Sequence, residues 1–216
     1  MKKLKVYLDT SVVSYLYQED AFERMQDTLA LWELFRQEVY EVYISDIILR
    51  EIDRCTEEKL RVLLDYMKQI KYHVIETDKD IVELAGKFID FGVLREKSFD
   101  DCQHIAAAIL AGCDVIISWN FKHIVNVKTV KGVKIITTME GYKDLLIYPP
   151  SALLEGDMSM MMTEPIVSKK FDVEDIRKIR EYNSLRHINM TPEEIIADTK
   201  KGAERIMELL QKEQCV

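Results

Sequence analysis

The 216-residue sequence lacks several features that would point to particular classes of protein. Its longest apolar run, Ile105 to Cys113, is much too short to span a bilayer, and no signal-peptide stretch follows the basic residues at its start. Its four cysteines form no CxxC pair and have no histidine nearby at zinc-ligand spacing. These absences predict a cytoplasmic protein without membrane contact, whose cysteines are reduced, structural thiols.

A surplus of positive charge is also missing. The chain has 30 lysine and arginine residues against 38 acidic ones, for a net charge of −8. Proteins that grip long nucleic acids through their phosphates are usually basic. The charge therefore weighs against a general nucleic-acid coat protein. It does not exclude an enzyme that cuts nucleic acid, because carboxylates can hold metal ions while basic residues act locally.

Short β-branched runs alternate with longer helical patterns through the first two thirds of the chain. The pattern predicts strands over residues 5–8, 42–44, 73–75, 115–118 and 133–136. Between them, the spacing of apolar residues predicts helices over 25–37, after Ser45, and over 59–70, 78–91 and 101–111. Strands separated by helices imply a central parallel sheet with helices on both faces.

This alternation stops at Pro149 and Pro150. We therefore expect an α/β domain over residues 1–150, followed by a methionine-rich linker over 151–163.

Two amphipathic helices are predicted beyond the linker, over residues 173–185 and 191–211. The second begins Thr191-Pro192-Glu193-Glu194, with a cap, a first-turn proline and first-turn acids. The appendage of residues 164–216 cannot bury much surface alone. It has to pack on the first domain, on itself or on a second copy, so we expect a homo-oligomer, most simply a dimer.

Polar side chains stand at the ends of the predicted strands or in the helices that follow. Asp9 directly follows the first strand, Glu51 lies in the helix after the second, Asp101 opens the helix over 101–111, and Asn120 follows the fourth strand. Ligands of open parallel sheets bind beyond the carboxyl ends of the strands, so these groups can converge. Carboxylates suit Mg²⁺ or Mn²⁺, and such ions hydrolyse phosphodiesters.

Taken singly, each of these residues has a simpler explanation. Asp9 suits a turn at a strand end, Glu51 suits a solvated helix face, Asp101 suits a helix cap, and Asn120 suits a turn. Their joint placement favours a metal site. A phosphatase that begins with a strand-end aspartate needs a second aspartate two residues on, where this chain has Ser11, so that class is excluded.

Local basic residues supply candidates for contact with phosphates. The stretch from Lys122 to Lys134 holds four lysines and no acid, and His123 lies within it. We take Ser11, Lys122 and His123 as candidate RNA contacts; the alternative is a set of solvated lysines on a loop and a strand edge. His104 has apolar neighbours, which favour a packed, hydrogen-bonded helix residue over a catalytic one.

Three segments together resemble PIN-domain proteins of the branch that includes VapC-type toxins. They are VYLDTSVVSYL, ISDIILREI and DDCQHIAAAILAGCDVIISWNFKHIVN, and the resemblance covers about residues 4 to 150. It implies a three-layer α/β/α fold and a toxin–antitoxin endoribonuclease that uses one or two Mg²⁺ or Mn²⁺ ions. By position, Asp9, Glu51 and Asp101 match the family's first three acids. Asn120 stands where many members carry a fourth.

The segment from about residue 162 resembles the short helical antitoxins encoded beside some PIN toxins. This suggests an antitoxin-like tail, acting in cis or in trans, in which Arg177 or Arg180 pairs with the acidic residues. A packing or dimerisation element is the alternative. For the whole chain, the alternative is a catalytically inactive PIN-like module that binds RNA or a protein, which Asn120 and the net negative charge favour.

Overall fold

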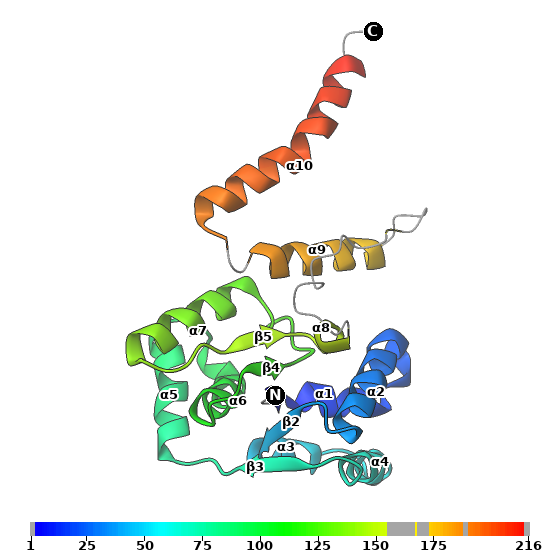
Figure 1. The fold of residues 1–216 in the computed structure, drawn as a ribbon, viewed down its shortest axis with the longest axis vertical. Helices are drawn as coiled ribbons and strands as arrows, with labels where there is room; N and C mark the ends of the chain where they lie inside the picture. The colour runs from blue at the N-terminus through cyan, green and yellow to red at the C-terminus, as the bar shows by residue number, and fades with distance from the viewer. Residues whose placement is uncertain (1–2, 155–166, 168–172, 188–189, 214–216) are drawn as a thin grey trace. The chain divides into compact units, whose positions relative to one another are not determined.

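The chain divides into two compact units, Met1–Met161 and Met162–Val216, in a computed structural model. The structure describes residues 3–154, 167, 173–187 and 190–213 (Figure 1).

A five-stranded parallel sheet forms the centre of the first unit. Its strands are β1 (Lys5–Leu8), β2 (Glu41–Ser45), β3 (Tyr72–Ile75), β4 (Val115–Ile117) and β5 (Leu146–Tyr148). They lie in the order β3-β2-β1-β4-β5, and every neighbouring pair is parallel. The first strand of the chain is therefore the middle strand of the sheet, where its apolar residues are buried on both faces.

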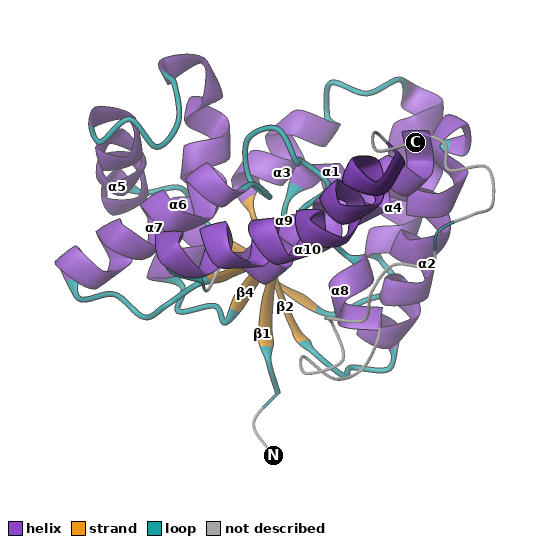
Figure 2. Ribbon diagram, turned by 90° about the horizontal axis from the view of Figure 1, so that it is seen from above, coloured by secondary structure: helices purple, strands orange, loops and turns teal. Residues whose placement is uncertain are grey.

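Helices cover both faces of this sheet. They are α1 (Thr10–Ser14), α2 (Phe22–Arg36), α3 (Asp46–Ile52), α4 (Glu57–Met67), α5 (Lys79–Asp90), α6 (Phe99–Leu110), α7 (Val127–Glu140) and α8 (Ser151–Leu154). Short 3₁₀ turns cover Tyr15–Tyr17, Glu19–Ala21 and Glu96–Ser98. Figure 2 shows α5, α6 and α7 on one side of the strands, with α2, α4 and α8 on the other. The predicted α/β fold with three layers is confirmed.

Alternation along β1 divides its side chains between the two faces of the sheet. Val6 and Leu8 belong to the core that includes residues of α2 and α4. Tyr7 points to the opposite face, where its hydroxyl meets His104 of α6. Asp9 comes two residues after Tyr7, so the same alternation directs it toward α6.

The strand predicted over residues 133–136 is wrong, because this segment lies inside α7. Asn126 caps the helix by accepting a hydrogen bond from the amide of Thr129 at 3.0 Å, and Gly141 ends it with a φ of 72°. Buried Val130, Val133 and Thr137 recur at helical spacing. The last strand is instead β5, which the pattern analysis missed.

The segment expected to be a linker, residues 151–163, begins with helix α8. Ala152 and Leu153 of α8 are buried, and the carbonyl oxygen of Leu153 accepts a hydrogen bond from the Tyr40 hydroxyl at 3.2 Å. Packing of these two apolar side chains therefore extends the first unit past Pro150. Residues 155–163 lie outside the described part of the chain.

The second unit contains the two predicted helices, α9 (Val173–His187) and α10 (Pro192–Glu213). Thr191 and Glu194 form a reciprocal cap at the start of α10: the Glu194 amide donates to the Thr191 hydroxyl at 3.3 Å, and the Thr191 amide donates to the Glu194 carboxylate at 2.7 Å. Asp198 on α10 contacts Arg186 and His187 on α9, which joins the two helices. Among the described residues, no helix is both long and apolar enough to cross a membrane.

A substitution at Gly132 would test how closely α7 packs in the first unit. A Cβ atom added at this position would lie 2.6 and 2.7 Å from the two methyl carbons of buried Val93. We expect Gly132→Ala to lower the free energy of unfolding by about 1–2 kcal/mol, because overpacking outweighs the gain in helix propensity. Gly86→Ala in α5 is the matched control: nothing lies within 4 Å of its added Cβ. The control should raise stability by about 0.5–1 kcal/mol in urea denaturation. Equal effects of both substitutions would contradict the packing shown here.

Candidate active site

Asp9 lies where the central strand ends and α1 begins. It caps α1, and its Oδ2 atom accepts hydrogen bonds from the Ser11 amide at 3.3 Å, from the Ser11 hydroxyl, and from the Ser118 hydroxyl at 2.7 Å. Ser118 is available because β4 pairs with β1 so that Ile117 lies beside Leu8. Only 4% of Asp9 is exposed, so this carboxylate is held in place by neighbouring hydroxyls and not by solvent.

His104 of α6 lies between two of the predicted acids. Its Nε2 atom is 3.4 Å from a carboxylate oxygen of Glu51 and 3.7 Å from Oδ1 of Asp9, and the Thr10 hydroxyl is also within 3.4 Å. Its Nδ1 atom is 2.8 Å from the hydroxyl of Tyr7. The ring is 2% exposed and engages partners through both nitrogens. The expectation that His104 is a packed, hydrogen-bonded residue agrees with this geometry, but its contacts also place it at the centre of the acids.

Interactions within this group of side chains shift two pKa values in opposite directions, raising that of His104 and lowering that of Glu51. Burial alone would lower the pKa of His104, but the hydrogen bond with Glu51 and the charges of Asp9, Glu51 and Asp101 outweigh it and raise that pKa. Burial would raise the pKa of Glu51, but hydrogen bonds from His104 and Thr10 outweigh it and lower that pKa. A protonated His104 therefore acts as a counter-charge to the carboxylates.

Asp101 lies in the first turn of α6 and is held by Asn120. The Asn120 side-chain amide donates to Oδ1 of Asp101 at 2.8 Å, while its carbonyl oxygen accepts from the backbone amide of His123 at 3.0 Å. Because a backbone amide can only donate, these two contacts fix the orientation of the Asn120 side chain. Burial raises the pKa of Asp101, and the negative charge of Asp9 raises it further.

The adjacent acid, Asp100, faces a different environment. Its side chain is about half exposed and forms an ion pair with Arg50 at 2.9 Å. Neither acid is the N-cap of α6, which is Ser98, so the simpler explanation of Asp101 as a capping residue does not describe its contacts.

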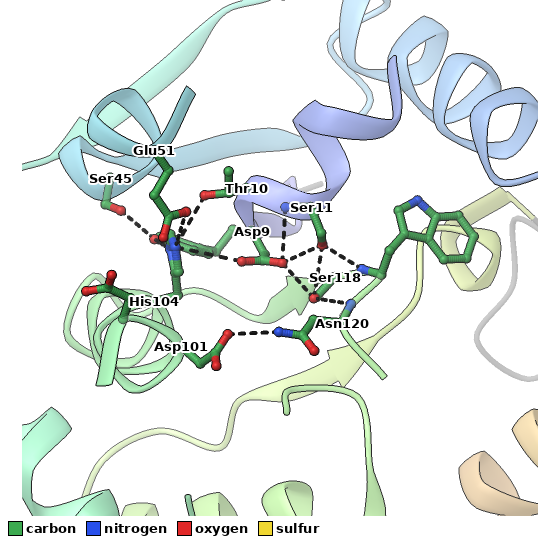
Figure 3. A network of polar contacts seen from close by, with 12 residues as sticks. Asp9, Thr10, Ser11, Ser45, Glu51, Asp101, His104, Ser118 and Asn120 are labelled. Carbon is green, nitrogen blue, oxygen red and sulfur yellow. Dashed lines mark hydrogen bonds and ion pairs between the residues drawn. The ribbon is translucent and has the colours of Figure 1, made fainter. Parts of the chain in front are cut away.

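Figure 3 shows Asp9, Glu51, Asp101 and Asn120 gathered with His104 at the carboxyl end of the sheet. Among the described residues, no three histidine, cysteine or acidic side chains are grouped as a ready metal site. The chemistry of the donors nevertheless fits Mg²⁺ or Mn²⁺, because these are hard oxygen ligands. Mg²⁺ keeps several water molecules and is commonly bound through only one or two carboxylates. The residues thus fit a hydrated cation better than one enclosed by three side chains.

The three candidate phosphate contacts have different surroundings. The Ser11 hydroxyl is engaged by Asp9 and by the Trp119 backbone amide at 2.9 Å, so in this structure it orients Asp9. Lys122 is exposed on the loop after β4, and His123 lies 3.3 Å from the Ser98 hydroxyl through Nδ1. Lysines 128, 131 and 134 lie on α7 and not on a strand edge. Contact of these groups with RNA stays a prediction.

Arg177 and Arg180 are exposed residues of α9 in the second unit. The two units are not placed relative to one another, so pairing of these arginines with the acids stays a prediction.

Sequence reasoning missed the hydroxyl groups that organise the site. Tyr7 is fully buried, and its hydroxyl also lies 2.7 Å from the Ser45 hydroxyl. Ser45 stands at the N-cap position of α3, but its hydroxyl makes no capping bond. Ser118 could have been found as the first polar residue after an apolar strand.

Comparisons with known proteins add little to this description. No protein-family model matches the chain, and no curated protein matches it. A solved structure with some similarity is the crystal structure of VapBC2 from Rickettsia felis bound to a DNA fragment from their promoter. It is 14% identical, with a TM-score of 0.44, and the match covers 68% of this chain and 98% of the other. The class defined by the chain's own geometry is an α/β protein with an acidic cluster at the end of a parallel sheet.

The raised pKa of His104 predicts a pH dependence of stability in the metal-free protein. Contacts of the imidazolium with Glu51 and Asp9 stabilise the fold fully below the ordinary pKa of 6.5, and this stabilisation is lost as the pH rises through the raised value. We expect the free energy of unfolding, measured by urea denaturation with a chelator, to fall as the pH rises from the ordinary pKa of 6.5 through the raised pKa of His104. His104→Gln should remove this slope, whereas the control His123→Gln should keep it. An unchanged slope in His104→Gln would sink the assignment.

Proposed function

We propose that this protein is an endoribonuclease that uses Mg²⁺ or Mn²⁺ to hydrolyse phosphodiester bonds in RNA. The observation that carries the proposal is the convergence of Asp9, Glu51 and Asp101, from three separate segments, at the carboxyl end of the sheet. Oxygen ligands of this kind suit such cations, and parallel sheets bind ligands at this edge.

Asp9 and Asp101 are the residues we assign to hold the cation. The charge of Asp9 raises the pKa of Asp101, which indicates two negative groups close enough to repel each other. A cation beside them would relieve that repulsion. When bound, it would supply an activated water and stabilise negative charge on the phosphate. Glu51 adds a third carboxylate, 3.4 Å from Nε2 of His104.

The remaining residues position these acids. Ser11 and Ser118 hold Asp9, and Asn120 holds Asp101. His104 balances negative charge while remaining fixed by Tyr7. Their combined effect is to pre-organise the carboxylates before RNA or metal binds, which is how a site avoids reorganisation during reaction.

RNA as the substrate, and a toxin–antitoxin context, rest on the resemblance of the three sequence segments to VapC-type PIN domains. A catalytically inactive binding module is the second candidate. The specific observation in its favour is Asn120, whose amide donates to Asp101 at a position where many family members carry an acid.

Neighbouring aspartates of α6 allow a matched test of the proposal. We expect Asp101→Asn, like Asp9→Asn, to reduce cleavage of single-stranded RNA by more than about 100-fold, because even residues that only support metal ligands contribute about 10- to 100-fold. Mn²⁺ binding, measured by titration calorimetry, should weaken in both variants. Asp100→Asn is the control and should keep binding and cleavage, because Asp100 pairs with Arg50.

Three results would contradict the proposal. They are cleavage that persists with a chelator, equal loss in the Asp100 and Asp101 variants, and an absence of cleavage with either metal both by the intact chain and by a variant that carries Arg177→Ala with Arg180→Ala. Mn²⁺-independent RNA binding without cleavage would support the inactive module instead.

We further propose that the second unit regulates this site, as an antitoxin-like segment acting in cis or across a homodimer. Arginine side chains pair well with carboxylates and would compete with a cation there. Arg177 and Arg180 are exposed on α9 at a spacing of three residues, so they lie near each other on the helix.

A full-length double variant tests this regulation. If the arginines inhibit, Arg177→Ala with Arg180→Ala should increase RNA cleavage by about tenfold, which corresponds to roughly 1.4 kcal/mol of lost pairing. Lys178→Ala, at an exposed position on the same helix, is the control and should leave the rate unchanged. Unchanged cleavage in the double variant would favour a role of the second unit in packing or dimerisation, which sedimentation would show.

A further inference from the structure

An arginine surrounded by aromatic rings lies beside the candidate active site. The guanidinium carbon of Arg24, on α2, is 5.6 Å from the ring centre of Tyr15, 5.5 Å from that of Trp119 and 5.3 Å from that of Phe121. Arg24 also donates a hydrogen bond to the Tyr15 hydroxyl at 2.9 Å. These four residues are called the aromatic cluster below.

The chain links this cluster directly to the acids. In the segment from Ser118 to Phe121, alternate residues serve the two sites. Ser118 binds Asp9, and Asn120 binds Asp101, whereas the rings of Trp119 and Phe121 contact Arg24. The acids and the aromatic cluster are therefore neighbours, because consecutive residues of this one segment contact the two sites in turn.

One residue of the aromatic cluster is buried and fixed, and the other three are partly exposed. Trp119 is only 6% exposed, and its indole N–H donates to the hydroxyl of buried Thr28 at 2.9 Å. Tyr15, Arg24 and Phe121 are half-buried, so each of these residues is partly open to solvent. Trp119 lies 5.9 Å from Tyr15 and 6.1 Å from Phe121 between ring centres.

Surfaces of this composition recognise unpaired nucleobases. Bases of single-stranded RNA stack on aromatic rings and on arginine guanidinium planes, and the arginine adds an attraction for the phosphates. The positive charge matters here because the neighbouring site is acidic and would otherwise repel a nucleic acid.

We propose that the aromatic cluster is a nucleobase subsite, in which one unpaired base of an RNA strand stacks on Phe121 and Arg24 while its phosphodiester lies toward Asp9 and Asp101. This inference rests on the proposed ribonuclease function and makes it more specific. A base held in this way has to leave a duplex, so the substrate is single-stranded RNA or an unpaired loop.

The test measures binding apart from cleavage. The full-length protein is titrated, with a chelator, into a labelled, unstructured oligoribonucleotide and into the same strand with abasic positions. Phe121→Leu keeps an apolar side chain without the ring, and Arg24→Met keeps the aliphatic stem without the charge. Each should weaken binding of the base-containing strand by roughly 5- to 150-fold, the effect of losing one stacked base. Binding of the abasic strand should change much less with Phe121→Leu.

Phe91→Leu is the matched control, because Phe91 is 58% exposed and follows α5 on the other side of the sheet. It should leave binding of both strands unchanged. Tryptophan fluorescence of the unmutated protein gives a second measurement. Of the two tryptophans, both buried, Trp119 is the one beside Phe121 and Arg24, so emission should change with the base-containing strand and not with the abasic one.

The outcomes separate this inference from the proposed function. If the intact protein cleaves RNA while both variants bind the base-containing strand normally, the subsite is overturned and the ribonuclease stands. If no chain cleaves RNA but base-dependent binding is lost in the variants, the subsite stands and the ribonuclease fails. Two other results would also overturn the subsite. One is that the variants lower the melting temperature without weakening binding of the base-containing strand. The other is that a blunt duplex binds as tightly as the single strand.

Discussion

Repulsion between one buried carboxylate and its partly buried neighbours is the constraint around which the polar part of this fold is built. Asp9 is almost fully buried, and its charge raises the pKa of Asp101, which burial already raises. Like charges held together in a poorly solvated place destabilise the folded state unless other groups compensate. His104 compensates with a positive charge when it is protonated, Ser11 and Ser118 with hydroxyl donors, and Asn120 with an amide donor. The neighbours of each acid are donors for this reason.

The register of the central strand makes this compensation possible. Tyr7 and Asp9 are two residues apart, so they face α6 together while Val6 and Leu8 pack into the opposite core. Pairing of β1 with β4 brings Ser118 to Asp9, and pairing with β2 brings Ser45 within reach of Tyr7. A shift by one residue would turn both Tyr7 and Asp9 into the apolar layer. The hydrophobic pattern of β1 thus also determines the geometry of the acids.

Sequence patterns predicted the elements whose apolar runs are unambiguous. Strands β1 to β4 and the acids at their ends follow directly from alternation and from the rule that parallel sheets bind ligands at their carboxyl edge. The pattern failed at α7, where the β-branched residues Val133 and Ile136 indicated a strand. Local preference was overridden there by the Asn126 cap and by packing at helical spacing.

The central position of His104 could not be read from its apolar neighbours, which describe only the helix around it. Its spacing of three residues from Asp101 was informative, since residues three apart share a helix face. The contacts with Tyr7 and Glu51, by contrast, arise from three segments distant in sequence. Such contacts depend on strand order and register, which no single segment encodes.

Asn120 shows how the net charge of the site bears on the number of cations. Asp9, Glu51 and Asp101 carry three negative charges when ionised, and His104 offsets part of this charge when it is protonated. A carboxylate at position 120 would add a fourth negative charge and would lose the hydrogen bond that the Asn120 amide donates to Asp101. It would then need a second cation to hold the same arrangement. The amide instead keeps Asp101 oriented without adding negative charge, so under the proposed function we expect a single divalent cation at this site.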